Sequence, residues 1–198
     1  MDSRQWDERY SGDGYEWKTE PNQFVAAELA GLPPGRALDL AAGEGRNSVW
    51  LAQRGWRVTA VDFSRVGLEK GRKLGAERTV TVDWVQADLL GYRPTVSAFD
   101  LVLIAYLHLD APSRRIVLGR AAAALAPGGT LFIVGHDLAN LTSGTGGPQD
   151  PAILYTAEAL RAELPGLRAI RAEQVRRTVG DRVAIDTLGL FTSPPPAG

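Results

Sequence analysis

The stretch ALDLAAGEGRNSVWLA, Ala37 to Ala52, decides the fold. It places a short apolar run that contains one acid before a turn with two glycines, and a helical run follows. The pattern predicts a strand over 36–41 and a helix over 45–55. A glycine-rich turn between a strand and a helix lets the backbone approach a ligand closely, so it is typical of sites for dinucleotides, nucleoside sulfonium compounds or phosphate.

The same alternation of strand and helix continues along the chain. It predicts further strands over 56–62, 80–88, 98–109 and 130–137 and helices over 65–75, 113–129 and 156–164. Gly180 and Asp181 predict a hairpin turn between antiparallel strands over 167–179 and 182–193. We therefore expect an α/β fold: a doubly wound, Rossmann-like sheet of seven strands, mostly parallel, with an antiparallel C-terminal hairpin strand.

Composition narrows the function classes. The chain has 198 residues, 44% of them hydrophobic, which predicts a single domain over 1–198 with a cap segment at 1–23 and a disordered tail at 194–198. A net charge of -1 argues against nucleic acid or an anionic membrane as a partner. The lack of cysteine excludes thiolate nucleophiles and thiolate metal sites, and no metal site is expected. Without a signal peptide or a spanning segment, the sequence predicts a cytoplasmic protein.

Ligands of a doubly wound sheet bind outside the carboxyl ends of its strands. Three predicted strands end at an acid: Asp39 lies just before the turn 41–45, Asp62 ends the second strand and Asp88 ends the third. A carboxylate at Asp39 repels a pyrophosphate but can hold an ammonium group. Asp62 is placed to accept from ribose hydroxyls, and Asp88 from the amine of adenine. An ammonium, a ribose and an adenine together describe S-adenosylmethionine.

Several segments resemble those of a class I S-adenosylmethionine-dependent methyltransferase: ALDLAAGEGRN, VTAVDFS, VQADLL, FDLVLIAYLHL and LAPGGTLFIVG, followed by the hairpin. The start WDERYSGDGYEWKTEPNQFV and the turn GEGRNSVWLA resemble the branch that includes tellurite-resistance and thiopurine-type methyltransferases. The resemblance implies that the N-terminal segment folds over the cofactor. It also implies that Gly43 and Gly45 shape the methionine end and that Asp88 with Leu89 meets adenine.

The predicted cofactor-binding residues are Arg9, Asp39, Ala41, Gly43, Gly45, Arg46, Asn47, Asp62, Phe63, Asp88 and Leu89. Several have a structural alternative. The glycines can serve only a tight turn, Asp39 can be a buried acid bonded to backbone amides, and Phe63 can be plain core. Arg46 and Arg9 are rival candidates for the methionine carboxylate, and either can instead be solvated.

A general base helps methyl transfer to alcohols, phenols and amines and matters little for soft anions such as thiolates. His108 and His136, the two histidines of the chain, lie at the ends of the predicted fourth and fifth strands, and Tyr106 lies near the end of the fourth. They are candidate catalytic or acceptor-contacting residues, although a strand-end histidine is often only a structural hydrogen bonder. The long glycine-rich stretch 138–155 is a candidate lid.

The sequence thus predicts an S-adenosylmethionine-dependent methyltransferase for a small-molecule acceptor such as a thiol, a selenium or tellurium species or another small nucleophile. A methyltransferase for a macromolecule, an NAD-dependent oxidoreductase and a noncatalytic cofactor-binding module remain alternatives. The sequence allows either a monomer or a homodimer.

Overall fold

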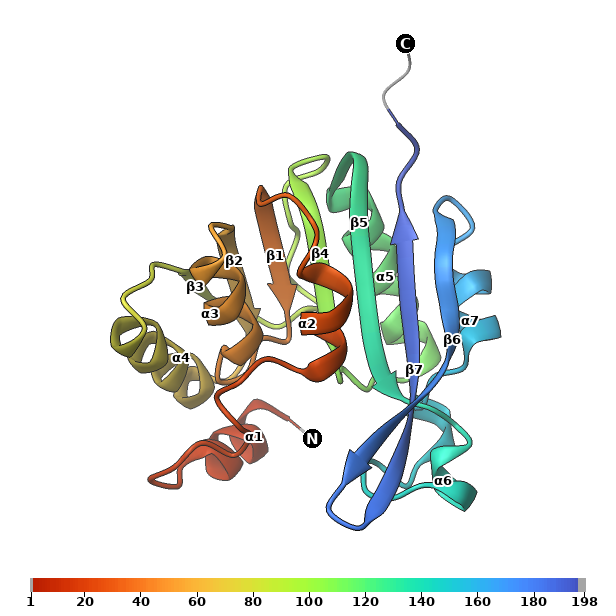
Figure 1. Cartoon of the computed structure of the whole chain (residues 1–198), viewed down its shortest axis with the longest axis horizontal. Helices are drawn as coiled ribbons and strands as arrows, with labels where there is room; N and C mark the ends of the chain where they lie inside the picture. The colour runs from red at the N-terminus through yellow and green to blue at the C-terminus, as the bar shows by residue number, and fades with distance from the viewer. Residues whose placement is uncertain (1, 196–198) are drawn as a thin grey trace. The chain divides into compact units, whose positions relative to one another are not determined.

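The computed structural model describes residues 2–195. Its seven strands follow the order β3-β2-β1-β4-β5-β7-β6 in a mostly parallel sheet whose C-terminal strands are antiparallel (Figure 1). The predicted α/β fold is confirmed. The chain divides into two compact units, 1–93 and 94–198, which are described in turn. Of the predicted tail, residues 196–198 lie outside the described residues.

Unit 1 holds three parallel strands: β1 (Arg36–Leu40), β2 (Arg57–Asp62) and β3 (Asp83–Gln86). Its helices are α1 (Ser3–Tyr10), α2 (Gln23–Leu29), α3 (Arg46–Gln53) and α4 (Arg65–Glu77). Helix α3 packs on β1 and β2, and α4 packs on β2 and β3. Three glycines make α4 a weak helix by propensity, but two of them leave room for aromatic rings: Tyr10 packs at Gly67, and Trp84 packs at Gly71.

Unit 2 holds β4 (Phe99–Ala105), β5 (Leu125–His136), β6 (Arg168–Val179) and β7 (Arg182–Thr192). Strand β7 runs antiparallel between β5 and β6, as the hairpin turn predicts. Helices α5 (Ala111–Ala124) and α7 (Ala157–Glu163) pack on these strands. Between β5 and α7 lie the short helix α6 (Asn140–Ser143) and the 3-10 turn η1 (Pro151–Ile153).

The prediction for the helix over 113–129 is wrong at both ends. The helix begins at Ala111 because the side chain of Asp110 caps it by accepting from the Ser113 amide. It ends at Ala124, and Leu125 already has extended backbone. Pro127 disfavours the helical conformation of the residue before it, so the chain enters β5 earlier than the apolar pattern indicated. Strand β3 is also shorter than the predicted 80–88.

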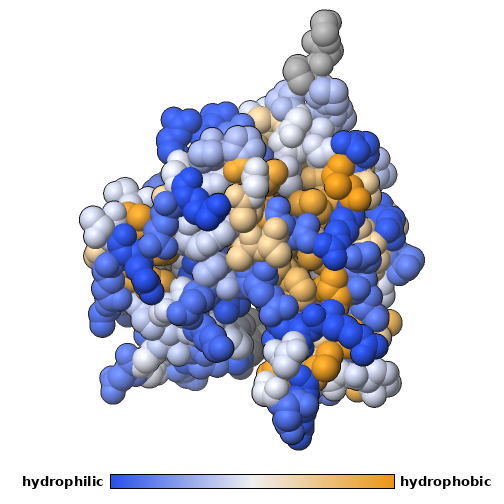
Figure 2. Space-filling model, viewed as in Figure 1, coloured by the Kyte–Doolittle hydropathy of each residue, from blue (hydrophilic) through white to orange (hydrophobic). Residues whose placement is uncertain are grey.

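Figure 2 shows apolar side chains at the surface over β6 and β7 of unit 2, and Ile170, Val179 and Val183 are among the exposed apolar residues of these strands. Within residues 2–195, no helix is both long and apolar enough to cross a bilayer.

Candidate functional site

The glycine turn of unit 1 is held in left-handed backbone conformations. Ala41 has φ 63°, Gly43 has φ 55° and Gly45 has φ 77°. A non-glycine residue in this region costs about 1–2 kcal/mol. Such strain gathers at functional sites, where the surrounding structure maintains it. Here the Ala42 amide donates to the Val61 carbonyl at 3.1 Å, so the turn is tied to the end of β2.

Asp39 is a buried acid with one unpaired oxygen. Its side chain lies inside β1, 1% exposed, and its Oδ2 accepts from the Ser48 hydroxyl at 2.6 Å. Its Oδ1 has no hydrogen-bond partner. Burial raises the pKa of Asp39 to about 7 although the Ser48 bond opposes the shift. An unpaired buried acceptor costs free energy, so the site fits a cationic donor such as an ammonium group.

Asp62 joins the turn to the end of β2. Its Oδ2 accepts from the Gly43 amide and its Oδ1 from the Ser64 amide, both at 2.8 Å. Burial raises the pKa of Asp62 while these backbone bonds lower it. A carboxylate offers about four acceptor positions, so Asp62 can still accept from a ribose hydroxyl beside these backbone bonds.

Two predicted cofactor residues have structural tasks in unit 1. A Cβ at Gly45 would lie 2.7 Å from Cζ3 of Trp84, so this glycine is required by packing. The buried side chain of Asn47 accepts from the Asn22 amide at 2.9 Å, which anchors the start of α2. Arg46 is half-buried, and its charge lowers the pKa of Asp39.

The residues predicted to contact adenine are more exposed than Asp39 and Asp62. Asp88 is exposed, and its Oδ1 accepts from the Leu90 amide at 2.8 Å. Phe63 and Leu89 are half-buried. Gln86 ends β3 opposite Asp62 in the register and donates to the Phe63 carbonyl at 3.3 Å. This glutamine was not singled out from the sequence, because the predicted strand 80–88 continued two residues beyond it, whereas β3 ends at Gln86.

The N-terminal segment packs against the turn. Arg9 donates to Glu16 at 2.7 Å and stacks on Trp6 and Trp17, so its partners here belong to the segment itself. The hydroxyl oxygen of Tyr10 lies 2.8 Å from the position of a Cβ at Gly43. Glycine at position 43 thus leaves room for the Tyr10 hydroxyl beside the turn.

Glu44, which the sequence analysis missed, holds this segment. Its carboxylate is 4% exposed and accepts from the amides of Glu16 at 3.0 Å and Trp17 at 3.2 Å. The Lys70 ammonium lies 3.3 Å from the same carboxylate and also donates to the Gly14 carbonyl. No sequence pattern could reveal Glu44, because its main partners are backbone amides far away along the chain.

In unit 2, the sequence-predicted Tyr106 is part of a buried polar cluster. It follows β4 with the left-handed φ of 59°. Its hydroxyl donates to Oδ2 of Asp186 at 2.8 Å, and the Arg177 Nε donates to the same oxygen at 2.9 Å. Asp186 is fully buried. Burial alone raises the pKa of Asp186, but the nearby His136 ring and the hydrogen bonds from Arg177 and Tyr106 outweigh it and hold the pKa below its usual range.

The two histidines stack on each other, with ring centroids 5.4 Å apart. The Nδ1 of His108 lies 3.1 Å from the Ile153 carbonyl, which accepts only, so this nitrogen carries the proton. Burial lowers the pKa of His108 to about 4. The Nδ1 of His136 instead lies 3.2 Å from Oδ1 of Asp186.

The stretch 138–155 is well tied within unit 2. The Asn140 side chain donates to the Gly146 carbonyl at 2.8 Å and accepts from the Ile185 amide at 2.7 Å. The backbone of Gly147 covers the His136 ring: a Cβ there would lie 2.7 Å from ring carbon Cδ2. The stretch therefore contacts a predicted catalytic residue, and its role as a moving lid stays a prediction.

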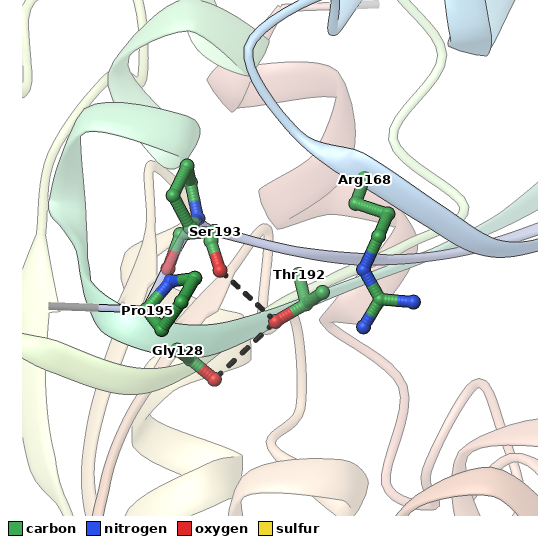
Figure 3. Close-up of a pocket in the computed structure, with 6 residues that line it drawn as sticks. Gly128, Arg168, Thr192, Ser193 and Pro195 are labelled. Carbon is green, nitrogen blue, oxygen red and sulfur yellow. Dashed lines mark hydrogen bonds between the residues drawn. The ribbon is translucent and has the colours of Figure 1, made fainter. Parts of the chain in front are cut away.

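A cavity of about 500 Å³ opens in unit 2 beside Gly128, where β6 begins and β7 ends. Figure 3 shows the Thr192 hydroxyl bonded to the Gly128 and Ser193 carbonyls there, with Arg168 alongside. Gly128 lies near the start of β5, whereas His136 ends that strand. The cavity is thus remote from the predicted catalytic residues.

Residues 37–129 match the family model described as "Methyltransferase domain". This part of the chain is therefore similar to methyltransferase domains. Over 113 residues the chain is 35% identical to a ubiquinone biosynthesis O-methyltransferase of Xanthomonas campestris pv. campestris (strain B100), covering 56% of this chain and 46% of that protein. It is 36% identical over 124 residues to a demethylmenaquinone methyltransferase of Clavibacter sepedonicus, covering 62% and 48%. The chain spans about half the length of these curated relatives.

The solved structures confirm the fold of the methyltransferase domain. The N-methyltransferase NodS from Bradyrhizobium japonicum WM9, in complex with S-adenosyl-L-homocysteine, matches with a TM-score of 0.75 and 18% identity over 97% of this chain and 98% of that one. S-adenosylmethionine is the cofactor of this domain type. Unit 1 fits it, because the unpaired Asp39 oxygen suits the ammonium and the strained turn exposes backbone for the amino-acid end.

Proposed function

We propose that this protein transfers the methyl group of S-adenosylmethionine to a small-molecule acceptor. The observation that carries the proposal is the unpaired, buried carboxylate oxygen of Asp39 beside a strained glycine turn. A pyrophosphate would face repulsion from this acid, so the site favours a sulfonium cofactor with an ammonium group over a nicotinamide dinucleotide. The matched methyltransferase domain supports the same conclusion.

Within unit 1, each part of the cofactor has its own protein groups. Asp39 holds the ammonium, the turn 41–45 with Arg46 or Arg9 holds the carboxylate, and Asp62 accepts from the ribose. Asp88, Phe63 and Leu89 meet the adenine. The sulfonium supplies an activated methyl group, so the protein's task is to align the acceptor and exclude water, effects that reach about 7–11 kcal/mol.

For the acceptor, we propose a small nucleophile. The net charge of -1 gives no field that attracts nucleic acid. The relatives named as acting in ubiquinone and menaquinone synthesis support a small acceptor. Membership of the tellurite-resistance and thiopurine branch would instead imply a soft sulfur, selenium or tellurium acceptor. We also propose a single cytoplasmic domain, as a monomer or homodimer.

Calorimetric titration of the protein with S-adenosylmethionine, S-adenosylhomocysteine and NAD tests the cofactor. We expect both sulfur compounds to bind and NAD not to bind. Binding of NAD alone contradicts the proposal. A panel of thiols, phenols, amines and oxyanions, with methylated product detected by mass spectrometry, then tests turnover. Cofactor binding without any product from this panel would favour a macromolecular acceptor or a noncatalytic module.

A further inference from the structure

The cavity of about 500 Å³ in unit 2 is built from three strands and the chain that follows them. Gly128 belongs to β5, Arg168 is the first residue of β6, and Thr192 is the last residue of β7. The chain that leaves β7 completes the lining with Ser193, Pro194 and Pro195. A cavity of this volume lies in the range that small-molecule sites of proteins occupy.

The pairing of the strands holds this lining in place. Arg168 and Thr192 are partners in the antiparallel register of β6 and β7, so their side chains stand on the same face of the sheet. After β7, the Pro194 carbonyl accepts from the Gly128 amide at 3.0 Å. This bond keeps the chain beside the start of β5, so Pro194 and Pro195 form one wall of the cavity.

Most polar groups of the lining are bonded to the protein itself. The Thr192 hydroxyl lies 3.3 Å from the carbonyl oxygens of Gly128 and Ser193 (Figure 3). The Ser193 hydroxyl donates to the Ala126 carbonyl at 2.6 Å, and the amides of Gly128 and Ser193 also donate to carbonyls. Proline has no amide hydrogen. The walls therefore offer a ligand mainly apolar contact.

Arg168 carries the charge of the cavity, since the other five lining residues are uncharged. Its side chain is exposed, and its guanidinium has no hydrogen bond or ion pair with any other residue of the described range 2–195. Figure 3 shows the guanidinium beside Thr192. The cavity thus combines apolar walls with one cation that no acid of the described chain neutralises.

Two other arginines of β6 show that this combination is particular to Arg168. Arg177 donates to the buried carboxylate of Asp186 at 2.9 Å, so its charge is used within the fold. Arg176 is exposed like Arg168 but does not line the cavity. Arg168 differs from the first in its lack of an acid and from the second in its place at the cavity.

We propose that this cavity binds a small carboxylic acid with an apolar body. The planar guanidinium of Arg168 holds the carboxylate through paired hydrogen bonds, and the apolar part lies against Pro194 and Pro195. Inorganic phosphate is a poorer match, because it has no apolar part and the lining holds only one cation. The site goes beyond the proposed methyl transfer and does not depend on it, since no lining residue was assigned to the cofactor or the acceptor.

NMR of the backbone amides of the full-length protein, titrated with octanoate, tests the site. We expect saturable shifts of the Gly128 and Thr192 amide signals. Octanamide has the same chain without the charge and should bind about fivefold more weakly, the upper range for an exposed ion pair. Acetate and inorganic phosphate lack the apolar chain and should give no saturable shift. Equal affinities for octanoate and octanamide, or shifts only at other amides, overturn the proposal.

Arg168→Gln tests the cation, and Arg176→Gln is its matched control on the same strand. Both side chains are exposed, so neither variant should disturb the fold. Arg168→Gln should weaken octanoate binding about fivefold and leave octanamide binding unchanged. Arg176→Gln should bind both compounds like the wild type. Equal losses of octanoate affinity in the two variants would show that only the general charge of β6 attracts the acid, and would overturn the site.

Pro195→Ser tests the apolar wall. It should weaken octanoate and octanamide by the same factor, about threefold, because both compounds lose the same apolar contact. Unchanged affinities for both compounds would overturn the placement of the apolar part against this wall. None of these measurements uses S-adenosylmethionine, so failure of the proposed function leaves them unaffected, and their failure leaves the proposed function standing.

Discussion

The glycine turn of unit 1 and the polar cluster of unit 2 are built in opposite ways. The turn comes from one continuous stretch, in which Asp39, Ala41 and Gly43 follow one another and backbone amides supply most bonds. The cluster takes Tyr106 from the end of β4, His136 from β5 and Arg177 and Asp186 from β6 and β7. The turn presents strained backbone and one carboxylate oxygen without a partner. The cluster instead consists of side chains that contact one another.

This difference predicts how each region responds to change. A backbone site fails when a side chain is added, because no neighbour can move away from a close-packed turn. A side-chain cluster fails when one partner is removed, because a buried charge or donor is then left unpaired. The variants below test this contrast, from the largest expected effect to the smallest.

The largest effect is expected for Gly45→Ala. The added Cβ meets the Trp84 ring and the backbone of Gly71 while φ is +77°, so overpacking and strain together should destabilise the fold by about 2–5 kcal/mol. Urea unfolding measures the loss, and calorimetry should show that the cofactor no longer binds.

Gly146→Ala is the matched control for Gly45→Ala, since it has a φ of +69° but nothing within 4 Å of the added Cβ. It should cost only about 1–2 kcal/mol. Equal losses of stability in the two variants would mean that backbone strain, and not the contact with Trp84, causes the loss in Gly45→Ala.

Asp39→Asn should separate stability from function in unit 1. The folded-state pKa of Asp39 is raised to about 7, so ionising this acid destabilises the folded state. This destabilisation is absent at low pH and grows as the pH rises to 7. At about 1.4 kcal/mol per pKa unit, the variant should be more stable than the wild type at pH 8 by a few kcal/mol. Its affinity for S-adenosylmethionine should nevertheless fall.

Asp88→Asn is the control for Asp39→Asn, because Asp88 is an exposed acid of the same unit. It should leave the stability at pH 8 nearly unchanged. If the wild type is as stable as Asp39→Asn at pH 8, the interpretation of Asp39 as a buried acid without a compensating cation is contradicted.

His108 gives the opposite pH dependence in unit 2. Its folded-state pKa of about 4 lies below the ordinary value of 6.5, so its contribution to stability is complete above pH 6.5 and is lost as pH falls towards 4. The loss amounts to about 3 kcal/mol. Thermal or urea unfolding between pH 7 and pH 4 should therefore show a flatter profile for His108→Gln than for the wild type. An unchanged profile in His108→Gln would contradict this account of His108.

The smallest effect is expected for Glu44→Gln. The amide side chain can still accept from the Glu16 or Trp17 amide but loses the ion pair with Lys70. We expect a loss of about 1–2 kcal/mol and faster protease cleavage within residues 11–20. Glu16→Gln, which alters only the more exposed pair with Arg9, should leave the cleavage rate near that of the wild type.

The sequence predicted the regular elements best where the signal is local. The strand and helix around the glycine turn and the hairpin at Gly180 lie as predicted, because each depends on residues within a few positions. The end of α5 was predicted wrongly, since the alanine-rich run favours helix while Pro127 and the pairing of β5 favour strand. Helix α2 was not predicted.

The same dependence on local sequence signals explains which residues of the candidate site could be proposed from the sequence. Asp39, Asp62, Ala41 and Gly43 could be proposed from the sequence because they stand at strand ends or in a recognisable turn. Gly45 was also noticed, but only the contact with Trp84 explains why it must be glycine. Glu44 and Asp186 gave no signal, since an acid in a turn or in a strand acquires its partners only after folding.

By itself, the amino-acid sequence determined the class of fold, the glycine turn and the acids at the ends of the strands, because periodicity and turn chemistry act over short distances along the chain. Only the tertiary structure decided that one oxygen of Asp39 stays unpaired, that Glu44 holds the N-terminal segment and that Asp186 faces His136 and not His108. Those facts depend on burial and on side chains brought together from distant strands, which no local pattern encodes.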